Sequence, residues 1–244
     1  MGRDPLRQEA LASARRQLLE HGVPGVTLAA VAQDLAVPES ELRDVVTSRE
    51  ELLETLYETT MDRLLAFLGS VVAQQDPDDL PAQVEAGTHA IVVWCGTHRA
   101  EFDLLMGPGF RQAVGARASV RQSIASRLGG AWAPLFDRVR RSGAPYPPDE
   151  EIPADLAAQL VVYRRFLVRD NAGMGDDFPL GVVYLMTVGW RQIFGVLCML
   201  AFDPETRPVS AFGDAITELN QSLLRLVGLE PSPAVRLTGI PEAA

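Results

Sequence analysis

Few residues in this chain have the types and spacing that catalysis or metal binding requires. The three histidines, His21, His89 and His98, are far apart and lack the spacing of a metal site. The Gly-Pro-Gly loop at residues 107–109 contains a proline, which removes a backbone N–H that a phosphate-cradling loop needs. No nucleophile elbow or zinc motif is present. We therefore expect no catalytic residue, no metal site and no cofactor.

A different chemistry is indicated by the segment Thr27–Leu53, TLAAVAQDLAVPESELRDVVTSREELL. A short helix begins at its first residue, a tight break follows at residues 36–38, and two further helices come after the break. Two short helices joined by a tight turn form a helix-turn-helix, whose second helix enters a DNA major groove. That second helix carries the carboxylates of Glu39, Glu41 and Asp44, where a surface facing phosphates needs cations. The spacing favours DNA binding, and the charges oppose it.

The composition limits the class of protein. The chain has 244 residues, of which 47% are hydrophobic and 22% charged, as is typical of a globular protein. Its net charge of −10 argues against a surface that binds polyanions generally, so any contact with nucleic acid must be local. All 22 basic residues are arginine, which indicates a GC-rich genome and hence a bacterial source.

Two cysteines and one long apolar segment bear on where the chain resides. Cys95 and Cys198 lie in apolar runs, so we expect two buried free thiols rather than a disulfide or a metal pair. The N-terminus has no apolar signal-peptide core, which predicts a cytoplasmic protein. The segment Leu180–Phe202 is long enough to cross a bilayer, but Arg191 lies at its centre. A helix buried in the protein or at a subunit interface fits this segment better.

Apolar residues repeat every three and four positions along the chain, so the predicted fold is all-α. The first helix is expected from residue 4 to Glu20, with Leu11, Ala14, Leu18 and Leu19 on one face, and Gly22 past its end. We expect a three-helix domain at residues 1–53, a linking helix at 48–75, a larger helical domain at 76–229 and a flexible tail at 230–244. Further helices are predicted at 81–97, 101–106, 116–142, 153–169, 179–202 and 209–227.

Capping residues fix where the N-terminal helices begin. Thr27 is expected to cap the second helix. Pro38 is expected to be the first residue of the third helix, where its missing N–H costs nothing. Ser48 and Glu51 have the spacing of a capping box for the fourth helix.

The N-terminal residues resemble the TetR family of bacterial transcriptional regulators. The ordered motif consists of Leu18-Leu19-x-x-Gly22, Val26-Thr27-x-x-x-Val31-Ala32, Val37, Leu42 and Ser48-Arg49-Glu50-x-Leu52-Leu53. Weaker likenesses occur at residues 98–106 and at Trp190–Gly195, where Phe194 stands in place of the usual histidine. The resemblance implies a homodimer whose last two long helices form the interface. It also implies a repressor that leaves operator DNA when a small apolar effector binds the C-terminal domain.

Carried onto this chain, the resemblance places DNA contacts at the second, third and fourth helices. We expect Thr27 to bind a phosphate, Arg43 to read guanine or bind phosphate, and Arg49 to replace the family's phosphate-binding lysine. The full expected set is Thr27, Ser40, Arg43, Thr47, Ser48 and Arg49. The chain departs from the family at Arg43, Val45 and Val46, where an aromatic residue, a histidine and a phenylalanine are usual. We expect the two valines to fill the core.

Aromatic and methionine side chains are concentrated in the C-terminal helices. Together with His98, Tyr163 and Arg191 as polar groups, they could line a pocket for a hydrophobic or aromatic effector. The alternative is that these residues form only the core and the subunit interface. The expected ligand contacts are Trp94, His98, Phe102, Met106, Tyr163, Phe166, Tyr184, Trp190, Arg191 and Phe194.

Two functions remain open at this level. The first is a TetR-type repressor released by a small effector. The second is a TetR-like scaffold with weak or no DNA binding, acting as a small-molecule-binding protein or an unusual enzyme through its C-terminal cavity. Residues 1–53 hold six arginines and nine acidic residues, a net charge of about −3, and this acidity motivates the second.

Overall fold

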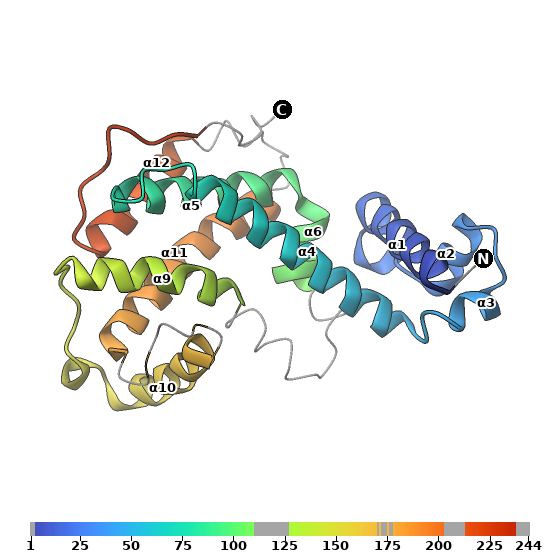
Figure 1. Ribbon diagram of the computed structural model, residues 1–244, viewed down its shortest axis with the longest axis horizontal. Coiled ribbons are helices and arrows are strands. Elements are labelled where there is room, and N and C mark those ends of the chain that lie inside the picture. The colour runs from blue at the N-terminus through green and yellow to red at the C-terminus, as the bar shows by residue number, and fades with distance from the viewer. Residues whose placement is uncertain are drawn as a thin grey trace. The chain divides into compact units, whose positions relative to one another are not determined.

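The computed structural model describes residues 3–109, 127–169, 171, 175, 178–202 and 213–237, and every regular element in these ranges is a helix (Figure 1). The all-α fold expected from the sequence is confirmed. The helices are α1 (Arg3–Gly25), α2 (Leu28–Asp34), α3 (Glu39–Arg43), α4 (Arg49–Val72), α5 (Leu80–Thr97), α6 (Arg99–Met106), α9 (Gly129–Arg141), the 3-10 turn η2 (Asp149–Glu151), α10 (Ala154–Arg169), α11 (Leu180–Phe202) and α12 (Gly213–Leu226).

The helices form two compact units. The first contains α1, α2, α3, α6 and α4 as far as Leu64; the second contains the rest of α4 with α5, α9, α10, α11 and α12. The sequence placed residues 101–106 in the larger C-terminal domain, whereas α6 packs against α1. The hydrophobic side chains Phe102, Leu104 and Leu105 of α6 are fully buried there.

α1 organises the first unit through one buried stripe. Leu6, Ala10, Ala14 and Leu18 recur every four residues and are inaccessible or nearly so. The face expected from the sequence was partly wrong, because Leu19 is 48% exposed. The regular helix stops as expected at Gly22, whose φ of 67° lies in the left-handed region that glycine adopts without penalty.

α11 organises the second unit. It packs against α5, α9, α10 and α12, which surround it in Figure 1. The core between α9, α10 and α11 includes Leu160, Leu167, Val183 and Met186. A second cluster joins Val84 of α5, Leu135 of α9 and Leu224 of α12.

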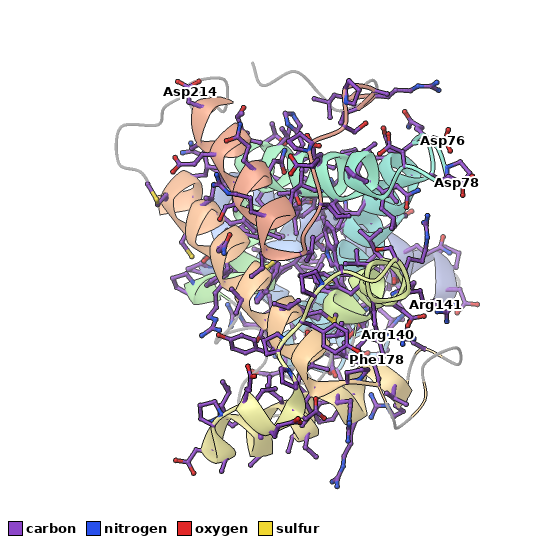
Figure 2. The ribbon with its side chains drawn as sticks, turned by 90° about the vertical axis from the view of Figure 1, so that its left-hand side faces the viewer. Asp76, Asp78, Arg140, Arg141, Phe178 and Asp214 are labelled. Carbon is purple, nitrogen blue, oxygen red and sulfur yellow. The ribbon has the colours of Figure 1, made fainter. Side chains whose placement is uncertain are left out.

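Two details secure α9 in this unit. Gly87 of α5 lies under the ring of Trp132, and a Cβ at this glycine would approach Cη2 of that ring to 2.8 Å. Arg138 of α9 donates to Oε1 of Gln83 of α5 at 2.7 Å, while Arg140 and Arg141, labelled in Figure 2, pair with Asp137 within α9 itself at 2.8 and 2.5 Å. The helix expected at 116–142 is described from residue 127 onward, and the first residues of the one expected at 209–227 also lie outside the described residues.

The segment after α12 is held against the start of α5. The Ser232 hydroxyl donates to Oδ2 of Asp79 at 2.6 Å. Gln75 and the backbone of Arg236 exchange two hydrogen bonds, at 2.7 and 2.9 Å. The tail expected to be flexible from residue 230 is therefore bound to the second unit as far as residue 237. We call residues 231–237 the C-terminal strap.

α11 is also the long apolar segment noted in the sequence. Residues Leu180–Ala201 are long and apolar enough to cross a membrane by length and composition, with a mean hydropathy of 1.5, and 39% of that window is buried. A core helix meets the same criterion, and α11 packs against four other helices. The thiol of Cys95 is buried as expected, whereas that of Cys198 is only partly buried, and burial raises the pKa of both.

Candidate functional site

α2, the following turn and α3 form a helix-turn-helix. Thr27 caps α2 as predicted, because its Oγ1 accepts from the backbone N–H of Ala30 at 3.1 Å. The turn is closed by Ala36, whose φ of 53° is left-handed. Pro38 precedes α3 as its N-cap and is not the first helical residue that we expected. Its carbonyl accepts from the N–H groups of Glu41 and Leu42, which begins the helix.

The outer side of α3 carries both the expected contact residues and the acidic ones. Leu42 is fully buried and fixes the orientation of this five-residue helix. Ser40 and Arg43 are exposed, as are Glu41 and Asp44. The surface that a major groove would meet therefore carries more carboxylates than cations.

Arg43 is paired within α3. Its Nη2 and Nε donate to Oε1 of Glu39 at 2.6 and 3.1 Å, one helical turn away. Both side chains are substantially exposed, so the pair contributes little to stability. The pair matters for recognition, because it cancels the charge of one acidic residue and engages the guanidinium that was expected to reach DNA.

The beginning of α4 is a modified capping box. Ser48 accepts from the N–H of Glu51 at 3.2 Å as expected, but the Glu51 carboxylate reaches Thr47 instead of the Ser48 backbone. It accepts from the Thr47 hydroxyl at 2.7 Å and N–H at 2.9 Å, and from Arg7 at 2.8 Å. The Thr47 hydroxyl, followed by Arg7, lowers the pKa of Glu51 to about 2. The Thr47 hydroxyl proton is thus already donated within the protein.

Arg49 points inward. Its Nε donates to the carbonyl of Val26 at 2.7 Å and its Nη2 to that of Val23 at 2.9 Å. Arg49 was expected to bind a phosphate, but its side chain is half-buried against the α1–α2 connection. The two valines at positions 45 and 46 were expected to fill the core. Val46 is buried as expected, whereas Val45 is only partly buried.

Five arginines of the first unit, Arg7, Arg15, Arg16, Arg43 and Arg49, share one property, which is that each donates to an acceptor of the protein. Arg43 and Arg49 have the partners given above. Arg7 donates to Glu51 and also to the carbonyl of Val45 at 2.6 Å. The remaining two pairs are Arg15 with Glu101 and Arg16 with Asp34. Any phosphate contact by these side chains therefore competes with an internal partner.

Glu101 of α6 joins three helices of the first unit and was not identified from the sequence. Its side chain is fully buried, and Oε1 accepts from Arg15 of α1 at 3.1 Å and Arg63 of α4 at 2.8 Å. His98 lies 3.9 Å from Oε2. No sequence signal singles out Glu101, because α6 also carries the charged residues Arg99 and Asp103, and the partners of Glu101 are 86 and 38 residues away.

The ten expected ligand contacts are divided between the two units. His98, Phe102 and Met106 lie in the first unit and the other seven in the second. Trp94 and Phe102 are buried, Tyr163 and Tyr184 pack against the core of α9, α10 and α11, and Arg191 is exposed. Trp190 and Phe194 contact each other with ring centroids 5.8 Å apart. A pocket shared by all ten residues stays a prediction.

α11 presents an apolar stripe on its outer side. Met199 is 66% exposed, and Gly195 one turn earlier faces open space, since a Cβ there would meet no atom within 4 Å. Val188, which is partly buried, lies on the same side of the helix nearer its start, and the exposed Arg191 interrupts the stripe between Val188 and Gly195. An exposed apolar stripe of this kind is typical of a helix that packs against another molecule.

Comparisons with known proteins agree with this geometry. HTH-type transcriptional regulators of Mycobacterium bovis and Mycobacterium tuberculosis are 29% identical to this chain over 235 residues, covering 91% of it and 93% of each relative. The solved structure of a putative TetR family transcription regulator from Shewanella sp. PV-4 has the same fold, with a TM-score of 0.53 and 17% identity. It covers 91% of this chain and 95% of the Shewanella chain. No protein-family model matches the chain.

The fold and the α2–α3 geometry define a helix-turn-helix protein of the type found in transcriptional regulators. The resemblance to TetR-family transcriptional regulators, first indicated by the motif between Leu18 and Leu53, is confirmed.

Proposed function

We propose that this chain is a cytoplasmic, homodimeric TetR-type repressor that binds operator DNA through α3 and the start of α4. The observation that carries the proposal is the orientation of α3, with Leu42 fully buried on one side and Ser40 and Arg43 exposed on the other. This orientation offers a base-reading side chain to a major groove. Thr27 supports it, because its Oγ1 caps α2 as an acceptor and its hydroxyl proton stays available for a phosphate oxygen.

Of the six expected contacts, we retain four as direct contacts with DNA and assign the other two mainly structural roles. Thr27, Ser40 and Ser48 contact DNA directly, and Arg43 does so after leaving Glu39. Arg49 acts mainly by holding the α1–α2 connection, through its bonds to Val23 and Val26. The hydroxyl of Thr47 donates to Glu51, so Thr47 mainly stabilises the start of α4 and does not donate a hydrogen bond to DNA.

The outer stripe of α11 supports the dimer. Val188, Gly195 and Met199 form an apolar surface that a second copy of the same stripe would cover. Gly195 would let the two helices approach closely. A two-fold dimer places its two recognition helices in successive major grooves, about 34 Å apart.

α4 supports control by an effector. Its first part belongs to the first unit, which holds α3, and its last part to the second unit, which holds most of the expected ligand contacts. An effector that changes the packing of the second unit would therefore act on the same helix that carries Ser48 and Arg49. Such regulation is a rigid-body movement of helices between two stable arrangements.

The internal pairing of the arginines favours a second candidate function. If DNA does not displace Glu39 from Arg43, the acidic α3 would make a poor binding surface. The chain would then be a TetR-like scaffold that serves small-molecule binding, or an unusual enzyme, through its second unit. This candidate differs from the first in predicting no operator.

A gel-shift assay against DNA flanking the chain's own gene, run at low salt, tests the proposal. Nanomolar, sequence-selective binding that weakens with added salt would support the repressor and exclude the second candidate. Absence of binding to any duplex at low salt would overturn the repressor. Release of the bound DNA by hydrophobic extracts of the host would identify the effector class.

A further inference from the structure

A groove lies between α5, α12 and the C-terminal strap in the second unit. Its volume is about 490 Å³, within the range of pockets that hold small organic molecules. It contains none of the ten ligand contacts expected from the sequence. Its principal walls are Glu85 and His89 of α5, Ile216, Asn220 and Leu224 of α12, and Val235 of the strap.

Asn220 gives the groove an unused hydrogen-bond acceptor. The residue lies on the buried side of α12, among Ile216, Leu223 and Leu224, and is only 9% exposed. Its Oδ1 has no hydrogen-bond partner. A buried carboxamide oxygen without a donor is unfavourable, and because Asn220 is one of the residues that line the groove, its unpaired oxygen indicates a ligand that donates a hydrogen bond.

The charge of the groove indicates what kind of donor this is. Glu85 accepts from the backbone N–H of Ser232 at 2.9 Å, and the described residues provide no cation within hydrogen-bond or ion-pair distance of it. Among the described residues that line the groove, none is an arginine. Burial lowers the pKa of His89, which therefore stays neutral at pH 7 and adds no positive charge. The polar part of the lining therefore consists of one carboxylate, that of Glu85, and neutral groups, and the rest of the lining is apolar.

We propose that this groove binds a small amphipathic organic amine in its protonated form. The ammonium group donates to the carboxylate of Glu85 and to Oδ1 of Asn220. The hydrocarbon part lies against Ile216, Leu224 and Val235. The strap forms one wall of the site, and its attachment to Asp79 and Gln75 keeps that wall in place.

The inference goes beyond the proposed repressor and does not depend on it, since binding is measured on the full chain without DNA. Isothermal titration calorimetry at pH 7 compares n-hexylamine, n-hexanol and n-hexanoate, which share a chain and differ in the polar group. We expect hexylamine to bind about tenfold more tightly than hexanol, and hexanoate to be excluded. Equal affinity for the three probes, or no binding of hexylamine, would overturn the proposal.

Two variants locate the interaction. Glu85→Gln keeps an acceptor for the Ser232 N–H but removes the charge, so it should weaken hexylamine about tenfold and leave hexanol unchanged. Asn220→Leu removes the unpaired oxygen at similar volume, so it should weaken both probes while the urea midpoint is retained. Glu218→Gln, at an exposed carboxylate of α12 outside the groove, is the matched control. Unchanged hexylamine affinity in Glu85→Gln would contradict the assignment.

Discussion

The guanidinium of Arg43 donates to Oε1 of Glu39 on the same side of α3, with Nη2 at 2.6 Å and Nε at 3.1 Å. The side chain that we propose to contact DNA is therefore held by a carboxylate of its own helix. In the proposed repressor, an operator must supply enough interaction to replace this partner. Glu39 would then compete with DNA for Arg43, and removing its charge should strengthen binding.

Glu39→Gln tests this competition. The change frees Arg43 and removes one negative charge facing the phosphates, so we expect duplex affinity to rise about 3- to 10-fold, since an exposed pair is worth up to about 1 kcal/mol. Fluorescence anisotropy on the preferred duplex measures the effect. Glu9→Gln, which removes an exposed carboxylate of α1, is the control. A loss of affinity in Glu39→Gln would show instead that Glu39 itself contacts a base.

Arg49→Ala tests the inward orientation of this arginine. The variant loses hydrogen bonds to the carbonyls of Val23 and Val26, which should lower the free energy of unfolding by about 1–3 kcal/mol. Urea denaturation measures the change. Arg16→Ala, which breaks only an exposed pair with Asp34, should cost less than about 1 kcal/mol. Equal costs for the two variants would contradict a structural role for Arg49.

Glu51 predicts a defined acid dependence of stability. Its folded pKa of about 2 lies below the unfolded value, so its stabilisation is fully present above about pH 4.5 and is lost as the pH falls toward 2. After allowance for solvent screening, the contribution is about 1–2 kcal/mol. The urea midpoint of Glu51→Gln should lie below that of the unmodified protein at pH 7, and the two should converge toward pH 2. Parallel curves over this range would contradict the assignment.

The cluster of Glu101 with Arg15 and Arg63 predicts that losing the carboxylate lowers the free energy of unfolding less than losing the two arginines. Glu101→Gln removes the buried charge and leaves two arginines that are more than 40% exposed and can turn to water, so it should cost about 1–2 kcal/mol. Arg15→Ala with Arg63→Ala removes both arginine partners of a buried carboxylate and leaves only His98 near it, so it should cost about 3–5 kcal/mol. Urea denaturation of the three proteins decides the point. A larger cost for Glu101→Gln would contradict it.

Met199→Glu tests the proposed subunit interface on α11. A charge placed in the outer stripe should shift the protein from dimer to monomer in sedimentation experiments, with little change in helical content. Val162→Glu is the matched control, because Val162 of α10 is also exposed, at 51%, and lies outside the stripe. A dimer that survives Met199→Glu would exclude this surface.

The parts of the fold that could be predicted from the sequence are those set by local interactions. Gly22, Thr27 and Ser48 act within four residues of their own position, so spacing alone located the kink of α1 and the first residues of α2 and α4. Long-range partners could not be predicted in this way. Arg49 was assigned to a phosphate because it stands where the resembled family has a phosphate-binding lysine, and nothing in the sequence shows that the carbonyls of Val23 and Val26 lie within its reach.

The second unit illustrates the same limit. A stripe of aromatic residues is consistent with a core, an interface or a pocket, and only the packing of α9, α10 and α11 shows that Tyr163 and Tyr184 contact the core. The hydrogen bond between Ser232 and Asp79 joins residues 153 positions apart. A proline-rich tail therefore had no sequence signal of attachment, and the groove beside it had none either.

Binding of duplex DNA by α3 through Arg43 is tested by fluorescence anisotropy of the unmodified protein and of Arg43→Ala. Both proteins are titrated onto the preferred duplex and a scrambled duplex across a range of salt concentrations. We expect nanomolar affinity of the unmodified protein for the preferred duplex, a steep loss of affinity with salt, and a sequence preference that is smaller by about 1–3 kcal/mol in Arg43→Ala. Affinity and preference that are unchanged in Arg43→Ala, or absence of binding to either duplex at low salt, would contradict binding through Arg43.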